Sequence, residues 1–376
     1  MTVLIMMLIV LGLLALQRRL YRKYWDKKLD LKLNFSAKEA FEGEKLTLRE
    51  EVTNAKLLPL PWVTAKFQIS RNLIFTEGRN HRITDDYYQN DLFSINMYQR
   101  ITRRQEFLCG SRGYYRIKSA DLASSDLFIR EKLVRRVPCH TELTVLPRLI
   151  PFGELEVIYR QVFGEIEVRR FTNLDPFAFR GIREYRPDDD FRLINFKATA
   201  KTGQLMVNVN SSTASQELII LLNLRPYGGW TSNEVLEEGI RLAASVAEHF
   251  SALGMAVGVL SNGRDAESGA SVLLEPGSGA SHVHNIWEYL ARIDIEAGQD
   301  TMVPLLTEQE DEKPFYLLIS SECTAQMQAA FEGMLESGLS CHWLVPHPRE
   351  TEMRLQEHPQ ITRWEVAPRA KTESIA

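Results

Sequence analysis

The N-terminal segment Thr2–Gln17 carries no charged side chain and consists mainly of Val, Leu, Ile and Met. A helix needs roughly 17 to 25 apolar residues to cross a bilayer, so this run lies at the short end of that range. Aromatic side chains anchor helices at the membrane surface and can extend the run. The residues that extend it are Leu20, Tyr21, Tyr24 and Trp25. The segment therefore predicts a single transmembrane anchor.

A cluster of six basic residues follows the apolar run and contains one acid, Asp26. The basic residues are Arg18, Arg19, Arg22, Lys23, Lys27 and Lys28. Lys and Arg accumulate on the cytoplasmic side of a membrane helix, so the domains after this flank are predicted to be cytoplasmic. A cleaved signal peptide is disfavoured because there is no basic n-region and no small-x-small cleavage site. A buried core helix would not explain the basic flank. We assign residues 1–28 to the anchor and its flank.

The whole chain of 376 residues has the composition of a globular protein, with 44% apolar and 25% charged residues. Its length accommodates about two ordinary domains. The net charge of -4 gives no general signal for binding a polyanion, so nucleic acid is not an expected partner. The four cysteines form no Cys-x-x-Cys pair. This argues against a disulfide scaffold or a zinc site and suits a reducing compartment.

Residues 29–147 predict an antiparallel β-sandwich. Val63, Ala65, Phe67 and Ile69 alternate with polar residues, which is the period-two pattern of a strand buried on one face. Other short runs of the same kind are separated by Gly, Pro and Asn. Several short strands with turns between them are typical of a sandwich.

A different rhythm begins after Glu217 and predicts an α/β domain over residues 213–370. The continuous apolar run Leu218–Leu222 is typical of a strand buried on both faces. Thr231 and Glu234 have the spacing of a capping box at the start of a helix. Further strands are expected over 255–260, 315–319 and 342–345, further helices over 281–293 and 325–335, and a loop or hairpin over 267–280. This alternation implies a largely parallel sheet. Residues 371–376 are expected to form a flexible tail.

A dense cluster of ten charges occupies residues 180–201, within the connector assigned to residues 148–212. Bulky apolar residues are interleaved with these charges, so the segment is expected to be partly buried and to need internal partners or an external ligand. Its candidate site residues are Arg183, Glu184, Tyr185, Pro187, Asp189, Asp190, Arg192 and Lys197. A strand is expected to follow over Leu205–Val209.

Three interpretations of this cluster remain open. It is an ion-pair network that satisfies itself, a surface that recognises a partner, or a site of acid catalysis by Asp189 and Asp190. Flanking cations would hold both aspartates ionised, which suits a general acid badly.

The charged segment resembles the signature of the bacterial domain-of-unknown-function family 58, a pattern close to Arg-Glu-Tyr-x-Pro-Gly-Asp-Asp-x-Arg-x-Ile-x-Trp-Lys. Here the pattern reads Arg183, Glu184, Tyr185, Pro187, Asp188, Asp189, Asp190, Arg192, Ile194, Phe196 and Lys197. Asp188 stands where the family has glycine, and Phe196 stands where it has tryptophan. Residues 42–44, 61–62 and 112–115 are more weakly similar to the membrane-proximal β-domain of that family.

The resemblance implies that a von Willebrand A-like, Rossmann-like α/β domain follows the β-sandwich. It also implies partnership with a MoxR-type AAA+ ATPase and other membrane proteins. Von Willebrand A-like domains often hold a divalent cation through Asp-x-Ser-x-Ser after the first strand, and the matching residues here are Asn223, Arg225 and Tyr227. Arg225 would place a cation where the metal belongs, so no bound metal is expected.

The sequence contains no Gly-x-x-x-x-Gly-Lys-Ser/Thr loop, no Gly-x-Ser-x-Gly elbow and no His-Glu-x-x-His helix. We therefore expect an α+β multidomain protein with no catalytic, cofactor-binding or metal-binding residue. The expected function is that of a membrane-anchored, non-enzymatic adaptor, a partner of the ATPase in envelope-associated protein assembly or maturation. The alternatives are a metal-dependent ligand-binding protein and an envelope-modifying hydrolase that uses Asp189 and Asp190.

Overall fold

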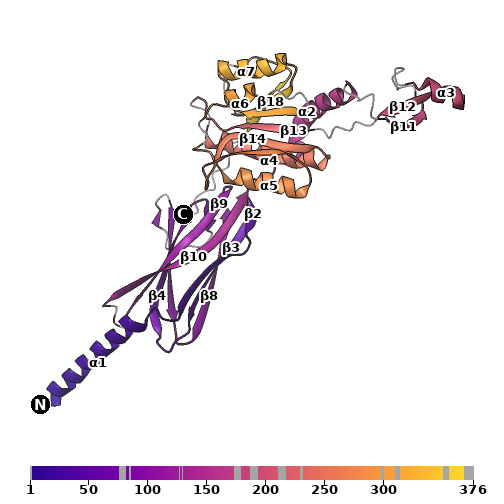
Figure 1. Cartoon of the computed structure of the whole chain (residues 1–376). Coiled ribbons are helices and arrows are strands. Elements are labelled where there is room, and N and C mark those ends of the chain that lie inside the picture. Colours follow the sequence, from indigo (N-terminus) through magenta and orange to yellow (C-terminus); the bar gives the residue numbers. More distant parts are fainter. Residues whose placement is uncertain are drawn as a thin grey trace. The chain divides into compact units, whose positions relative to one another are not determined.

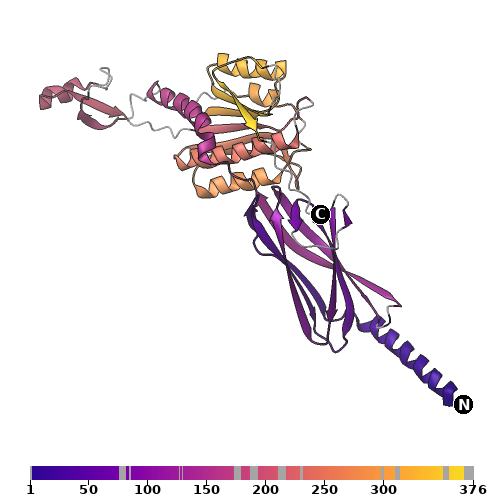
Figure 2. The ribbon, with the colours of Figure 1, turned by 180° about the vertical axis from the view of Figure 1, so that it is seen from behind.

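The computed structural model describes residues 2–75, 82–83, 86–126, 128, 130–172, 179–186, 194–210, 217–228, 232–297, 300–309, 314–349 and 355–367. The chain divides into two compact units (Figure 1), one made of residues 1–148 and 290–292 and the other of residues 149–289 and 293–376. Figure 2 shows the same ribbon from behind. Each unit has its own hydrophobic core.

Helix α1 (Thr2–Tyr24) forms the apolar N-terminal helix that the sequence predicts. Its stretch Val3–Tyr24 is long and apolar enough to cross a membrane, and in the described part of the chain no other helix has these properties. The most apolar part of this helix is not buried inside the protein. Near its C-terminal end, Tyr21 is 2% exposed and Trp25, just beyond it, is 6% exposed, and both belong to the core of the first unit.

The first unit consists of two packed β-sheets. One sheet has the order β1 (Leu29–Phe35), β3 (Lys45–Asn54), β8 (Gln99–Cys109) and β5 (Leu73–Phe75). The other has the order β2 (Glu39–Phe41), β10 (Lys132–Leu146), β9 (Gly113–Ser125), β4 (Leu60–Ser70), β7 (Asp86–Ile95) and β6 (Arg82–Ile83). Neighbouring strands are antiparallel except β2 and β10, which run parallel. The predicted antiparallel sheet is confirmed.

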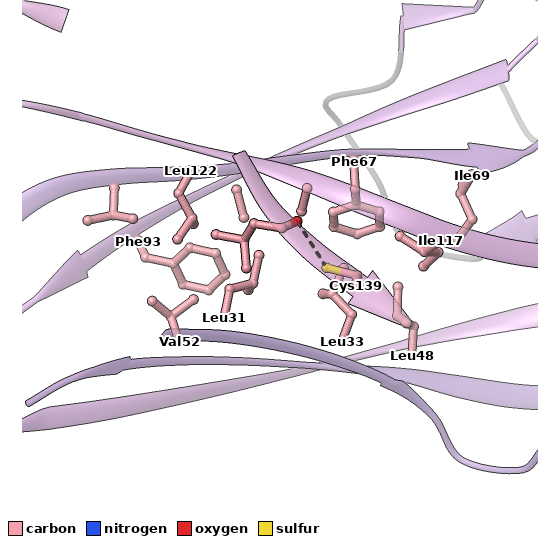
Figure 3. Close-up of a cluster of buried hydrophobic side chains, with 14 of the residues drawn as sticks. Leu31, Leu33, Leu48, Val52, Phe67, Ile69, Phe93, Ile117, Leu122 and Cys139 are labelled. Carbon is pink, nitrogen blue, oxygen red and sulfur yellow. Dashed lines mark hydrogen bonds between the residues drawn. The ribbon is translucent and has the colours of Figure 1, made fainter. Parts of the chain in front are cut away.

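The core of this unit lies between the two sheets. In β4 the predicted alternation is confirmed, because Val63, Ala65 and Phe67 are buried and Lys66 between them is exposed. Figure 3 shows side chains of both sheets meeting in this core, among them Val52 of β3 and Phe93 of β7.

The second unit contains one large sheet. Its strand order is β15 (Ser271–Gly277), β14 (Ala256–Asp265), β13 (Glu217–Asn223), β17 (Phe315–Ser320), β18 (Ser340–Pro348) and β19 (Ile361–Val366). Five neighbouring strands run parallel, as predicted: β14, β13, β17, β18 and β19. At one edge of the sheet, β15 pairs antiparallel with β14. The short strand β16 (Ile293–Asp294) also pairs antiparallel with β14. The strand order reverses between β13 and β17, because the chain passes from β13 to β14 on one side and later returns to β17 on the other side of β13.

Helices cover both faces of this sheet. The helices are α4 (Asn233–Ala252), α5 (Ala280–Arg292), α6 (Val303–Thr307) and α7 (Ala325–Glu336). Helices α6 and α7 share a core cluster with Leu221 and Leu318. On the opposite face, a Cβ on Gly239 of α4 would lie 3.6 Å from Ile319 and 3.8 Å from Leu222. Successive strand residues point to opposite faces, so the apolar run Leu218–Leu222 of β13 suits a strand that is covered on both faces.

Several elements differ from the sequence-based expectation. Helix α2 (Phe152–Thr172) was not predicted, although Leu155, Ile158 and Val162 are buried at the three- and four-residue spacing of a helix. Helix α3 (Phe196–Thr202), helix α6 and strand β19 were not predicted either. Strand β12 (Met206–Asn210) confirms the strand expected over residues 205–209.

The start of α4 also differs. Ser232 is its N-cap residue, so the capping box predicted from Thr231 is wrong. At its other end, Gly254 has φ 85°, a left-handed conformation that glycine adopts without strain, and the helix ends just before it, as predicted. The Gly- and Ser-rich segment 267–280 contains β15 and therefore forms the hairpin that was one of its two predicted conformations.

Candidate functional site

The carboxyl ends of β13, β14 and β17 carry the best-defined cluster of polar side chains in the second unit. In open α/β sheets, ligands bind outside the carboxyl ends of the strands at the point where the strand order reverses. Here Asn223 is the last residue of β13 and Ser320 the last residue of β17. Asn262 lies near the end of β14, and Glu322 follows β17 by two residues.

Asn223 is the centre of this cluster and is 3% exposed. Its amide nitrogen donates to Ser320 Oγ at 2.9 Å and to Glu322 Oε2 at 3.0 Å. Its amide oxygen accepts from Asn262 Nδ2 at 2.7 Å and from the backbone N–H of Arg225 at 3.0 Å. A side-chain amide has two donor hydrogens and two acceptor lone pairs, so Asn223 makes every hydrogen bond that it can make.

Glu322 is the only carboxylate side chain bonded to Asn223 among the described residues, and it is 2% exposed. The guanidinium of Arg225 lies 3.4 Å from Glu322 Oε1, and Thr324 Oγ1 donates to the same oxygen at 3.4 Å. Arg225 remains 42% exposed. A buried carboxylate requires such partners, because removing it from water is costly. The pair therefore neutralises the buried charge from the solvent side.

The other members of the cluster are held in the same way. Asn262 Oδ1 accepts from the backbone N–H of Leu224 at 2.8 Å, and its amide nitrogen also donates to the carbonyl of Asp300 at 2.7 Å. The neighbouring Cys323 is 3% exposed, and burial raises the pKa of its thiol to about 12. A thiol with that pKa stays protonated near neutral pH and makes a poor nucleophile.

The donor set of this cluster does not fit a divalent cation. Magnesium and calcium bind oxygen ligands, but the group directed at Ser320 Oγ and Glu322 Oε2 is the amide nitrogen of Asn223. Arg225 adds a positive charge at the same carboxylate. In the described part of the chain, no three His, Cys, Asp or Glu side chains are grouped so that they could hold a metal ion. The predicted lack of a metal remains a prediction.

The described residues at both ends of the charged signature lie on a small element of the second unit. Strand β11 (Phe179–Glu184) pairs antiparallel with β12, and Arg183 stands opposite Val207. The backbone N–H of Tyr185 donates to the carbonyl of Leu205 at 2.9 Å, and that of Asn195 donates to the carbonyl of Met206 at 2.8 Å. The residues before and after segment 187–193 are therefore both hydrogen-bonded to the backbone at the start of β12.

Helix α3 carries the end of the signature. Asn195 is its N-cap and accepts from the backbone N–H of Ala198 at 2.9 Å, and Gly203 ends it with φ 77°. The side chain of Thr199 accepts from the backbone N–H of Met206 at 3.0 Å, which ties the helix to β12. None of the residues in α3 is buried, and Phe196 is 76% exposed.

The described candidate residues are mostly exposed. Arg183 and Glu184 are exposed, and an Arg183 guanidinium nitrogen donates to the carbonyl of Glu184 at 3.0 Å. Tyr185 is half-buried and Lys197 is exposed. The remaining candidates, Pro187, Asp189, Asp190 and Arg192, lie outside the described residues. The expected ion-pair network and the possible acid pair therefore stay predictions.

Sequence reasoning missed part of both sites. Asn262 was not singled out, although it follows the apolar run 255–260 and so stands at the carboxyl end of a strand. Helix α3 was also missed, although Asn195 and Gly203 bracket it as N-cap and C-terminal glycine, which is a recognisable signal.

A family model described as "Protein of unknown function DUF58" matches residues 181–338. This part of the chain belongs to the DUF58 family. The match begins in β11 with the charged signature and extends through β13, α4 and β17 to the end of α7, so the predicted family is confirmed. No curated protein matches the chain.

Two solved structures that resemble part of this chain are remote in sequence. A non-cellulosomal cohesin from the hyperthermophilic archaeon Archaeoglobus fulgidus has 11% identity, covers 35% of this chain and 98% of its own, and gives a TM-score of 0.21. A CARDB domain from Pyrococcus furiosus, solved with di-metal ions, has 13% identity, covers 30% of this chain and 94% of its own, and gives a TM-score of 0.20. Similarities this low indicate neither the fold nor the function of this chain.

Proposed function

We propose that this DUF58 protein is a membrane-anchored, non-enzymatic adaptor that presents a protein-binding surface to a MoxR-type AAA+ ATPase. The observation that carries the proposal is the saturated amide of Asn223. At the carboxyl ends of the strands, where α/β proteins bind ligands, the polar groups of Asn223, Asn262 and Glu322 are bonded to one another and to Arg225. An arrangement of this kind suits a scaffold better than a site that must bind a substrate.

The topology of the second unit supports a von Willebrand A-like assignment for its α/β fold. Five parallel strands, an antiparallel edge strand β15, and helices on both faces are consistent with such a domain. The cation-binding Asp-x-Ser-x-Ser of such domains is replaced here by residues 223–227, so binding would proceed without a bridging metal.

The signature element offers the surface for the partner. Ile182, Phe196 and Leu205 are 41%, 76% and 48% exposed and all lie on the small element formed by β11, α3 and β12, and apolar side chains that gather on a surface mark interaction sites. Segment 180–201 carries six basic and four acidic residues, which would set the orientation of a bound partner. We infer that Phe196 inserts into a pocket of the ATPase while Arg183 and Lys197 pair with acids around it.

The membrane attachment is the second part of the proposal. The apolar side chains of α1 are exposed to the surroundings, and basic residues occupy its last turns. The helix would span the cell membrane once and leave both units in the cytoplasm.

Co-purification of the detergent-solubilised full chain with a MoxR-type ATPase tests the adaptor role. Arg183→Ala and Asp189→Ala should each reduce the amount of ATPase recovered, since both residues belong to the signature. Arg104→Ala, at an exposed position of β8, is the matched control and should recover the amount seen with the wild type. Recovery that is unchanged in both signature variants would remove the signature from the interface.

A further inference from the structure

A cavity of about 650 Å³ lies beside the C-terminal half of α1. It is lined by residues of that helix and of the connection between β9 and β10, including Arg18, Arg130 and Phe128. Both parts belong to the first unit, to which the end of α1 is bonded. Tyr21 Oη donates to the carbonyl of Pro59 at 2.8 Å, and Arg18 pairs with Glu131 at 3.0 Å.

The lining is rich in guanidinium groups. The four arginines are Arg18, Arg19, Arg22 and Arg130. Two carboxylates oppose them. Glu131 lies 3.0 Å from Arg18 and 3.6 Å from Arg22, and buried Asp126 accepts from the backbone N–H groups of Arg130 and Glu131. Four arginines against two acids leave two positive charges in excess.

One residue of the lining has a buried donor without an acceptor. Gln17 lines the cavity, and its amide nitrogen is buried without a hydrogen-bond partner among the described residues. A buried donor without an acceptor costs free energy, so an occupant that supplies an oxygen would relieve that cost. Guanidinium groups bind phosphate oxygens in pairs with matched geometry.

The apolar part of the lining indicates what else the occupant carries. Leu14 and Ala15 line the cavity on the side of the apolar helix, and Phe128 is 57% exposed on the opposite part. Exposed aromatic residues beside a membrane helix sit at the level of the lipid headgroups. An occupant with an anionic head and an apolar tail therefore fits both the charge and the position.

We propose that this cavity binds the phosphate headgroup of an anionic phospholipid, with the acyl chains lying along the apolar surface of α1. The inference rests on the proposed membrane anchor. The excess positive charge selects lipids with a net negative charge over zwitterionic lipids, because each basic residue near an anionic headgroup adds to the attraction. Bound lipid would fix the first unit against the membrane surface.

Native mass spectrometry of the detergent-solubilised full chain tests this proposal. Short-chain phosphatidylglycerol, short-chain phosphatidylcholine and inorganic phosphate are the three probes. We expect phosphatidylglycerol to be retained at least about tenfold better than phosphatidylcholine. Equal retention of the two lipids would overturn the proposal, and so would inorganic phosphate that binds as well as phosphatidylglycerol, because free phosphate would then be the ligand.

The double substitution Arg19→Gln and Arg130→Gln localises the site. Neither side chain has an ion pair among the described residues, so both changes leave the contacts with Glu131 intact. We expect the variant to lose the preference for phosphatidylglycerol, whereas Arg104→Gln, an exposed arginine in the middle of β8, should retain it. An unchanged preference in the double variant would also overturn the proposal. Alkaline extraction of membranes tests the transmembrane anchor separately from the lipid site. Release of the chain into the extract would contradict the anchor, whichever lipid the purified chain retains.

Discussion

Glu50 of β3 has no exposed surface in the core between the two sheets. Burial and the neighbouring carboxyl of Asp91 raise its pKa to about 9, although the guanidinium of Arg103 lowers it. Asp91 itself is bonded to Arg103 and accepts from Gln105 Nε2 at 3.0 Å, so the local positive charge is already paired. Glu50 is therefore a neutral acid near pH 7.

This buried carboxyl makes stability depend on pH. The unfolded chain releases the proton near the ordinary pKa of 4.5, whereas the folded chain keeps it up to about pH 9. The contribution of Glu50 to the free energy of unfolding is therefore complete below the pKa of the unfolded chain. It falls as the pH rises toward the pKa of the folded chain, by up to about 1.4 kcal/mol per pH unit. Glu50→Gln should flatten the decline of the unfolding midpoint between pH 5 and 9. Glu106→Gln, at an exposed position of β8, should not, and equal declines in the two variants would contradict this assignment.

The cluster around Asn223 should not bind magnesium. In the wild-type chain, millimolar magnesium should not shift the thermal midpoint of unfolding. The amide nitrogen of Asn223 and the guanidinium of Arg225 already contact the carboxylate of Glu322. Asn223→Asp replaces two donated hydrogen bonds with a carboxylate beside another carboxylate. It should lower the free energy of unfolding by about 2 to 4 kcal/mol.

Asn233→Asp is the control for this substitution, because it makes the same chemical change at the exposed start of α4. An acid there favours the helix dipole and should cost nothing. A magnesium-dependent rise of the midpoint in the wild-type chain would show that the cluster around Asn223 binds a cation.

Helix α3 has only seven residues and no buried side chain, so its stability depends on its ends. Asn195→Ala removes the N-cap bond to Ala198 and should destabilise the helix by about 1 kcal/mol. Hydrogen exchange of peptides from residues 195–203 would then become faster. Lys201→Ala, at an exposed position of the same helix, should leave that exchange rate unchanged. Equal protection in the two variants would mean that the cap does not hold the helix.

Elements with strong periodicity could be predicted from the sequence. Strand β4 alternates along its length, and the run Leu218–Leu222 is apolar because both faces of β13 are covered. Helix α2 was missed because apolar residues such as Val157 and Phe163 also stand outside the spacing of Leu155, Ile158 and Val162, so the segment shows no single apolar face. The parallel pairing of β2 with β10 joins residues about a hundred positions apart, and no local pattern encodes it.

The cluster at the carboxyl ends of the strands was only partly predictable, because it too joins residues that are distant in the chain. Asn223 and Arg225 were found by comparison with a motif, and both lie directly after the first strand of the sheet. Asn262 and the carbonyl of Asp300 reach the same cluster through tertiary structure, from strands and loops that are distant in the chain. The amide orientation that saturates Asn223 depends on all of these partners together.

At the scale of the whole molecule, the basic flank of α1 predicts the orientation in the membrane. Protease added to sealed right-side-out vesicles should leave the chain intact, and protease added to inverted vesicles should degrade both units. The physical reason is the preference of Lys and Arg for the cytoplasmic side. Digestion in right-side-out vesicles alone would place the units on the opposite face.

The affinity of the purified full chain for a purified MoxR-type ATPase tests the account most directly. Surface-exposed Phe196 is the expected anchor of the interface, so Phe196→Ala should raise the Kd at least about tenfold, as truncation of a hot-spot residue does. Leu253→Ala removes a similarly sized apolar side chain that is 47% exposed after α4 and should leave the Kd unchanged. If the wild-type chain shows no measurable affinity, or if both variants bind as the wild type does, the adaptor account is contradicted.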